Sequence, residues 1–182
     1  MFDLTFHHPF SMIVCGSSQS GKTTFCKRLI EHKRKLIKDA PAKVFLFYQE
    51  HQKLYDRMVR KKILTKAIRG IPEHAELKMM AKEVLETDPR GCIFILDDAL
   101  SILDGHAMEL LFAQTVHHQK VSVLLVTQSL FYKSKSMRTL SLNAQYLVIF
   151  KNVRDLRQIK TLGSQIGLHS ASFFVQSFQK AT

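Results

Sequence analysis

The residues with the most specific chemistry are those at positions 16–24, GSSQSGKTT, which match the phosphate-binding pattern GxxxxGK[ST] in full. The two glycines allow a tight loop whose backbone N–H groups face phosphate oxygens. Lys22 would bring a positive charge to the β- and γ-phosphates, and Thr23 would offer its hydroxyl to Mg²⁺. The alternative is a Gly/Ser-rich turn whose lysine is simply exposed. The sequence therefore predicts a P-loop for ATP and Mg²⁺, made by Gly16, Ser17, Ser18, Gln19, Ser20, Gly21, Lys22, Thr23 and Thr24.

A second candidate group is the pair of acids in residues 93–98, IFILDD, at the end of an apolar run. We expect this run to form a strand beside the strand that precedes the P-loop, where a carboxylate supports Mg²⁺ in P-loop nucleotide hydrolases. Asp97 is then the metal partner, and Asp98 is placed to polarise the attacking water as a general base. The alternative is structural, with either acid capping the turn at residues 99–103.

The third candidate is Gln128, in the segment Val126–Gln128 at the end of the next apolar run. Ligands of parallel sheets bind at the carboxyl ends of the strands. An amide at this place can hydrogen-bond the γ-phosphate or the attacking water and so sense hydrolysis. The alternative is an amide that is simply solvated in a loop.

Apolar runs and amphipathic segments alternate along the chain, and these elements must position the three candidate groups. Continuous apolar runs predict buried strands at Ser11–Cys15, Lys43–Tyr48, Cys92–Leu96, Val121–Val126 and Tyr146–Phe150. Helical spacing predicts helices at about Lys22–Lys38, Leu54–Ile68, Glu73–Glu86, Ala107–His118, Asp155–Ile166 and Ala171–Lys180. Strands that are apolar on both faces and alternate with helices predict an α/β fold, with a mainly parallel sheet sandwiched by helices.

Length and composition restrict the class of protein. The 182 residues favour one domain spanning 1–182, and 46% hydrophobic residues are enough for a packed core. No apolar run reaches the roughly 18–20 residues of a membrane span, and the N-terminal residues lack a signal-peptide pattern. We therefore expect an intracellular protein without a membrane partner. The three cysteines, Cys15, Cys26 and Cys92, have the spacing of neither a disulfide framework nor a zinc site.

Positive charge is the main clue to a partner. The chain has 27 Lys and Arg against 15 Asp and Glu, a net charge of +12. Two stretches, Lys22–Lys38 and Lys53–Arg69, each hold seven basic residues and one acid. An expected loop over 131–138 mixes Lys133 and Lys135 with aromatic residues, a mixture that suits phosphate contact with base stacking. This surplus favours a polyanion such as nucleic acid; the alternative is a set of solvated helix faces.

Four segments together resemble one family: GSSQSGKTT, FILDD, LLVTQSLF and NAQYLVIFKNVRDLRQIKTL. They are similar to the genome-packaging ATPases of the FtsK–HerA superfamily, in its poxvirus-type branch, and within it to those of Polinton (Maverick) elements and related large DNA viruses. The resemblance extends from about Pro9 to Thr182. It implies a RecA-like P-loop NTPase that forms a homo-oligomeric ring and pumps double-stranded DNA into a capsid.

The resemblance also implies roles for individual residues. It makes residues 16–23 the Walker A loop, Asp97 the Mg²⁺ partner and Gln128 the polar sensor. Asp98 occupies the position of the catalytic acid, where many members of the superfamily have the longer Glu.

A further implication of the resemblance is an arginine finger supplied by the neighbouring subunit. Arg154 and Arg157 fit this role better than Arg138, because both follow the last expected strand. The resemblance also implies capsid proteins as partners, a location in the virion or in the host nucleus or cytoplasmic viral factory, and one more strand after Thr182.

The sequence thus predicts an ATP-hydrolysing, DNA-translocating motor, and two rivals stay open. A P-loop small-molecule kinase needs a lid with arginines, which Arg154 and Arg157 could mimic, but the basic surplus fits it poorly. A subunit that binds DNA or a capsid and uses nucleotide without hydrolysing it would not need the intact set of Lys22, Thr23 and Asp97.

Overall fold

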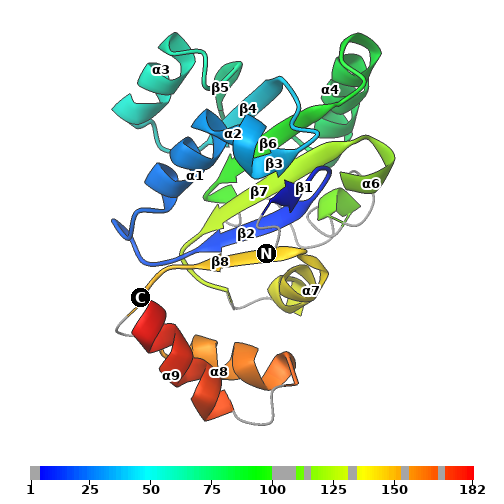
Figure 1. Ribbon diagram of the computed structural model, residues 1–182. Coiled ribbons are helices and arrows are strands. Elements are labelled where there is room, and N and C mark those ends of the chain that lie inside the picture. The colour runs from blue at the N-terminus through cyan, green and yellow to red at the C-terminus, as the bar shows by residue number, and fades with distance from the viewer. Residues whose placement is uncertain (1–4, 100–109, 113–115, 131–134, 153–155, 168–170) are drawn as a thin grey trace.

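The computed structural model describes residues 5–99, 110–112, 116–130, 135–152, 156–167 and 171–182. A sheet of six parallel strands forms the centre of this part of the chain, with helices on both faces (Figure 1). The strands are β2 (Ser11–Cys15), β4 (Lys43–Tyr48), β5 (Lys66–Arg69), β6 (Cys92–Asp97), β7 (Val121–Thr127) and β8 (Tyr146–Ile149). The helices are α1 (Lys22–Glu31), α2 (Lys33–Leu36), α3 (Lys53–Arg60), α4 (His74–Thr87), α6 (Val116–His118), α7 (Lys135–Asn143), α8 (Leu156–Gln165) and α9 (Ala171–Ala181).

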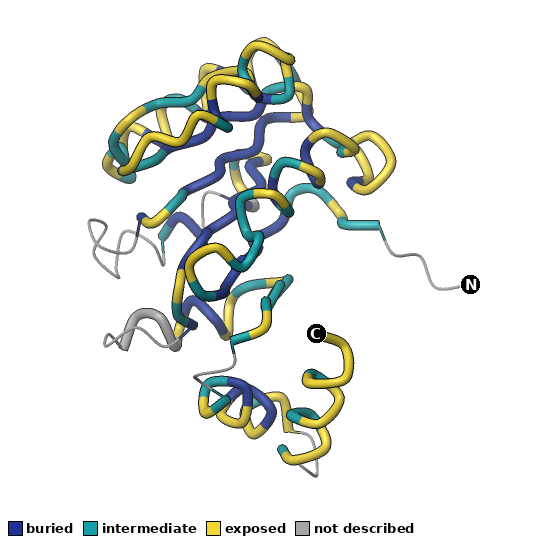
Figure 2. The backbone as a smooth tube through the Cα atoms, turned by 90° about the vertical axis from the view of Figure 1, so that its left-hand side faces the viewer, coloured by how far each residue is buried: buried dark blue, intermediate teal, exposed yellow. Residues whose placement is uncertain are grey.

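Apolar side chains cover both faces of the central strands. In β6, Phe94 and Leu96 belong to one buried cluster, and Ile93 and Ile95 belong to a second cluster on the opposite face. The buried strands run through the middle of the molecule, and the exposed backbone lies mainly on the surrounding helices and loops (Figure 2). This confirms the predicted α/β sandwich, because a strand that is apolar on both faces must be covered on both sides.

The helices divide between the two faces of the sheet. On one face, α1 and α3 contribute buried residues such as Leu29 and Met58. On the other face, α4, α7 and α8 contribute Leu77, Leu140 and Leu162. A short separate pair of parallel strands, β1 (Phe6–His7) and β3 (Ile37–Lys38), lies outside the main sheet.

The order of the strands in the main sheet is β5-β4-β6-β7-β2-β8. β7 pairs with both β2 and β6, so that Val126 lies opposite Val14 on one side and Asp97 on the other. The expectation that the strand of Asp97 lies beside the P-loop strand is therefore wrong. β7 takes the position between them because all seven of its residues are buried, as a central strand requires.

The first expected helix, over 22–38, is shorter than its periodicity suggests. α1 ends at Glu31, and His32 has non-helical backbone angles. After the short helix α2, Ile37 is buried and pairs with Phe6 in the small sheet. Pairing with a segment far away in the sequence overrides the local helical pattern here.

The second expected helix, over 54–68, also ends early. α3 stops at Arg60, and Lys62 has a φ of 55°, a left-handed conformation that interrupts a helix. The chain then extends as β5, which pairs with β4 at the edge of the sheet. An edge strand needs little apolar surface, so its sequence, KAIR, resembles the end of an amphipathic helix.

The loop expected over 131–138 is wrong in its second half, because α7 begins at Lys135. The helix forms there because its residue Leu140 enters the core. Lys133 lies outside the described residues, and so does half of the helix expected over 107–118 (residues 107–109 and 113–115), although Val116–His118 is helical. No helix in the described parts of the chain is both long and apolar enough to cross a bilayer.

Candidate nucleotide-binding site

The segments that follow four strands meet at one edge of the sheet. Because β2, β4, β6 and β7 are parallel, their carboxyl ends lie at the same edge (Figure 1). The segments after these strands surround a cavity of about 650 Å³. The cavity brings together the candidate groups from the sequence, since Ser18–Thr24, Asp97, Asp98 and Gln128 all line it.

The P-loop is fixed by hydrogen bonds within the loop and to β7. The Gly16 N–H donates to the Thr127 carbonyl (3.2 Å) at the end of β7. The Lys22 ammonium donates to the carbonyls of Gly16 (2.7 Å) and Ser17 (2.8 Å), which holds its charge over the loop. α1 begins at Lys22, so the positive end of the helix faces the cavity. These features together fit a site for phosphate groups.

Gly16 is required by close packing. This residue is buried, and a Cβ atom on it would lie 2.6 Å from both the Cβ of Phe150 and the Oγ of Ser20. Phe150 is held in place by its N–H, which donates to the Cys15 carbonyl (2.8 Å). The end of β8 therefore forms a wall against which the P-loop rests. Ser17 lines a second hollow, of about 540 Å³, between this wall and the loop.

Tyr55 orients the carboxylate of Asp97. Its hydroxyl donates a hydrogen bond to Asp97 Oδ2, and its ring, fully buried, packs against Tyr48 with 5.1 Å between the ring centroids. The sequence motifs alone do not mark this residue as part of the site. One feature of the sequence could have indicated it: Tyr55 is an aromatic residue within the basic segment Lys53–Arg69, and a large aromatic side chain is unusual on a solvated helix face.

Burial governs the charges in the site. Burial raises the pKa of the Asp97 carboxyl, and the neighbouring Asp98 adds to this, whereas the hydrogen bond from Tyr55 and the charge of Lys22 oppose it. Burial also lowers the pKa of Lys22, an effect that Asp97 opposes. Burial raises the pKa of Tyr55, so its hydroxyl stays protonated and remains a donor.

Asp98 and Gln128 are exposed residues at the rim of the cavity. Asp98 has a φ of 57°, whereas a helix N-cap usually has extended backbone angles, so Asp98 does not have the usual capping conformation. Its N–H donates to the Val126 carbonyl (3.1 Å), which ties the end of β6 to β7. Because β7 lies between β6 and β2, Gln128 follows a strand that separates the two acids from the P-loop.

The segment after β4 contributes residues that no sequence motif marks. Gln49, Glu50 and Gln52 all line the cavity, and Glu50 adds a second exposed carboxylate. The sequence does contain a pattern that could have predicted them, since these residues follow the apolar strand KVFLFY in the same way that Gln128 follows its strand. Strand order alone determines that this end faces the P-loop.

Two buried polar atoms of the site fit a polar ligand. Gln49 Nε2 and Ser20 Oγ are buried and have no hydrogen-bond partner among the described residues. A buried polar group without a partner costs roughly 1–3 kcal/mol, which a phosphate oxygen at hydrogen-bonding distance would remove. Both residues line the cavity, so these donors fit an anionic ligand.

The oxygen donors of the site fit Mg²⁺ that binds together with a nucleotide. Thr23 offers a hydroxyl and Asp97 a carboxylate, and both are hard oxygen ligands. The described residues contain no group of three or more His, Cys, Asp or Glu side chains that could hold a metal ion by itself. Mg²⁺ usually binds through one or two carboxylates together with substrate phosphates and water. Such a site needs no cluster of protein ligands.

The arginines expected as fingers are not brought to this cavity by the described part of the chain. Arg157 is exposed near the start of α8 and does not line the cavity. Its neighbour Gln158 accepts a hydrogen bond from the Leu130 N–H (2.8 Å), which fixes α8 to the segment after β7. Arg154 lies outside the described residues, and so does the side chain of Arg138.

Solved structures with the same fold confirm a RecA-like P-loop architecture. ATPases 2 and 3 of EssC from Geobacillus thermodenitrificans match with a TM-score of 0.60 and 12% identity, over 85% of this chain and 34% of theirs. The flagellar accessory protein FlaH from Methanocaldococcus jannaschii matches with a TM-score of 0.53 and 17% identity, over 82% of this chain and 76% of its own. A KaiC-like protein from Pyrococcus horikoshii matches with a TM-score of 0.55 and 16% identity, over 81% of this chain and 76% of its own.

At these identities the similarity establishes the fold, and the present chain spans about a third of the EssC chain. No protein-family model and no curated protein sequence matches the chain.

The contact between Tyr55 and Asp97 predicts a pH-dependent defect in Tyr55→Phe. This variant loses the hydrogen bond that favours the charged form of Asp97, so the pKa of Asp97 should rise further. We expect Mg²⁺-dependent binding of a fluorescent ATP analogue to weaken about tenfold, because a hydrogen bond to a charged group contributes roughly 1.5–3 kcal/mol. The acid limb of the binding profile should also move to higher pH.

Tyr48→Phe is the matched control, because it removes a hydroxyl from the ring that packs on Tyr55 and keeps the hydrogen bond to Asp97. Equal affinities and equal pH profiles in the two variants would contradict the role of Tyr55.

Proposed function

We propose that the protein is an ATPase that translocates double-stranded DNA as a homo-oligomeric ring. The observation that carries the ATPase part is the single cavity lined by Lys22, Thr23, Asp97 and Gln128. These residues supply the phosphate clamp, the metal ligands and the polar sensor that phosphoryl transfer to water requires. The similarity in fold to ATPases 2 and 3 of EssC supports the same interpretation, that the protein is an ATPase.

The chemistry follows from the positions of the side chains. Lys22 donates to the β- and γ-phosphate oxygens, and the N–H groups at the start of α1 hold the phosphates in place. Asp98 accepts the proton of the attacking water as a general base, and Gln128 hydrogen-bonds that water or the γ-phosphate. The hollow between the P-loop and β8 takes the nucleoside part of ATP.

Thr23 and Asp97 are the residues that would hold Mg²⁺ in this mechanism. The bound ion supplies positive charge to the phosphate oxygens. Tyr55 fixes the direction of the Asp97 carboxylate through its hydrogen bond and keeps that side of the carboxylate away from water.

Double-stranded DNA is the proposed polymer on which the motor acts. The net charge of +12 favours a polyanion, and the resemblance to packaging ATPases of the FtsK–HerA superfamily extends over most of the chain. On this proposal the protein packages the genome of a virus or of a Polinton-type element. Capsid proteins are then its partners, and it acts in the virion, the host nucleus or a cytoplasmic viral factory.

We assign the arginine finger to Arg157 of the neighbouring subunit, with Arg154 as the second candidate. Lys22 leaves part of the transition-state charge on the γ-phosphoryl group uncompensated, and a trans arginine is the usual complement in P-loop enzymes. Arg157 is exposed and does not line the cavity of its own chain, which supports action on a neighbour.

The central prediction is that duplex DNA stimulates ATP turnover. Steady-state ATPase rates with and without long double-stranded DNA test it, with Lys22→Ala as the measure of background, because this variant should lose turnover and keep its fold by circular dichroism. Phosphate transfer to a nucleoside would identify a kinase instead. Nucleotide binding without turnover would identify a non-hydrolysing subunit.

The two carboxylates at the rim of the cavity should differ in importance. Asp98 directly follows the metal ligand, so Asp98→Asn should bind ATP and hydrolyse it about 10²–10⁴ times more slowly, as expected when general-base catalysis is lost. Glu50→Gln is the matched control, since it removes an equal charge from the same cavity, and it should retain most of the turnover. The reverse result in single-turnover hydrolysis would assign the base to Glu50.

A trans finger predicts complementation between defective subunits. Lys22→Ala subunits lack turnover and keep Arg157, whereas Arg157→Ala subunits keep the P-loop. Mixtures should therefore recover part of the ATPase activity, because some interfaces pair an intact P-loop with an intact arginine. Absence of recovery at every mixing ratio, in mixtures shown to co-assemble, would rule out a trans role for this residue.

A further inference from the structure

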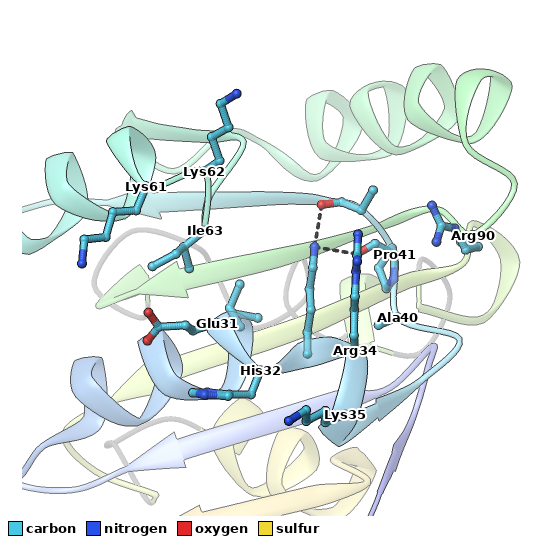
Figure 3. A pocket seen from close by; sticks show the side chains of 13 residues that line it. Glu31, His32, Arg34, Lys35, Ala40, Pro41, Lys61, Lys62, Ile63 and Arg90 are labelled. Carbon is cyan, nitrogen blue, oxygen red and sulfur yellow. Dashed lines mark hydrogen bonds between the residues drawn. The ribbon is translucent and has the colours of Figure 1, made fainter.

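Two basic segments that are far apart in the sequence meet at the other edge of the sheet. Residues 31–35, at the end of α1 and in α2, and residues 61–63, after α3, line one hollow of about 760 Å³ (Figure 3). Residues 40–42 and Arg90 complete it, and these precede β4 and β6. The hollow therefore lies at the amino-terminal edge of the sheet, opposite the nucleotide cavity.

Six basic side chains line this hollow, against a single acid, Glu31. We call the site the basic groove, defined by Lys33, Arg34, Lys35, Lys61, Lys62 and Arg90. Figure 3 shows Lys61 and Lys62 on one side and Arg34, Lys35 and Arg90 on the other.

Two acids near the groove, Glu31 and Asp88, are already paired. Glu31 accepts a hydrogen bond from Lys27 (2.8 Å), and Asp88 pairs with Arg90 (3.0 Å). Four cations remain, Arg34, Lys35, Lys61 and Lys62. All four are exposed, and none has an ion pair within 4.0 Å among the described residues. Their charge is available to a ligand.

Lys33 forms the floor of the groove. Its ammonium donates to the carbonyls of Pro41 (2.7 Å) and Ala42 (2.6 Å), which joins α2 to the segment before β4. Burial, together with the positive charges of Arg34 and Arg90, lowers the pKa of Lys33 to about 8. Positive charge is therefore crowded here, and an anion in the groove would relieve the repulsion.

We propose that the basic groove binds the phosphate backbone of double-stranded DNA. The identification of the ligand as DNA rests on the proposed function. The cations are spread along both sides of the groove, as a row of phosphates requires, whereas a single small anion needs donors that converge on one point. None of the described residues that line the groove is Phe, Tyr or Trp, so it lacks the stacking surface of a single-strand site.

The position of the groove connects it to the nucleotide site. α1 begins at Lys22 in the P-loop and ends at Glu31 in the groove. Its ten residues span about 15 Å. One helix therefore joins the phosphates of ATP to the phosphates of DNA at opposite edges of the sheet.

The test uses the double variant Lys61→Gln/Lys62→Gln in the full chain. Fluorescence anisotropy with a short labelled duplex gives the binding constant at a series of salt concentrations. Each lost phosphate contact should flatten the log–log salt dependence by about 1, so the slope should flatten by about 2. Arg34→Gln/Lys35→Gln, from the other side of the groove, should give the same result.

Lys78→Gln/Lys82→Gln is the matched control, because it removes two exposed charges from α4 on the opposite face of the sheet. Its slope should equal that of the parent. If the slope flattened equally in all three variants, or did not flatten in the groove variants, the groove would not be the DNA site. Either result would leave the proposed motor function standing. A parent protein that ignores duplex at low salt would overturn the proposed function itself. Binding of pyrophosphate to the parent protein that the groove variants lose, without any duplex binding, would reassign the groove to small anions.

Discussion

The parallel alignment of β2, β4, β6 and β7 is the constraint on which the nucleotide site depends. The alignment brings their carboxyl ends to one edge, and the register then fixes which side chains meet there, with Cys15 opposite Thr127 and Asp97 opposite Val126. Burial on both faces holds this register, because a slip by one residue would exchange the two faces of a strand. Since β7 occupies the position between β2 and β6, it sets the spacing between the P-loop and the Asp97 carboxylate.

Charged groups in the site are partly withdrawn from water, and their neighbours compensate for this. Burial disfavours the charges of both Asp97 and Lys22, and each of these two residues favours the charged form of the other. Tyr55 adds a hydrogen bond to Asp97 from a fully buried ring. A divalent cation placed here would further favour the charged form of Asp97, and a nucleotide phosphate that of Lys22, so the charges of the site fit the two ligands bound together.

Helix α1 joins the candidate nucleotide site to the basic groove. Its first turn contributes to the P-loop, and its last turn borders the basic groove. Its apolar face, including Leu29 and Ile30, is buried against the sheet, which makes the helix a rigid link between the two edges.

The sequence by itself determined the P-loop, the buried strands and the two acids at the end of β6, because each is encoded in a continuous local pattern. The tertiary structure alone decided which strands are neighbours. It inserted β7 beside the P-loop strand and converted residues 66–69 into an edge strand, whose short sequence resembles part of a helix. It also brought Tyr55 to Asp97, Glu50 to the cavity and Lys61 to the side of the groove opposite Arg34. Pairings between distant segments depend on complementary burial across the whole sheet and leave no trace in local periodicity, which is why these features appear only in the folded chain.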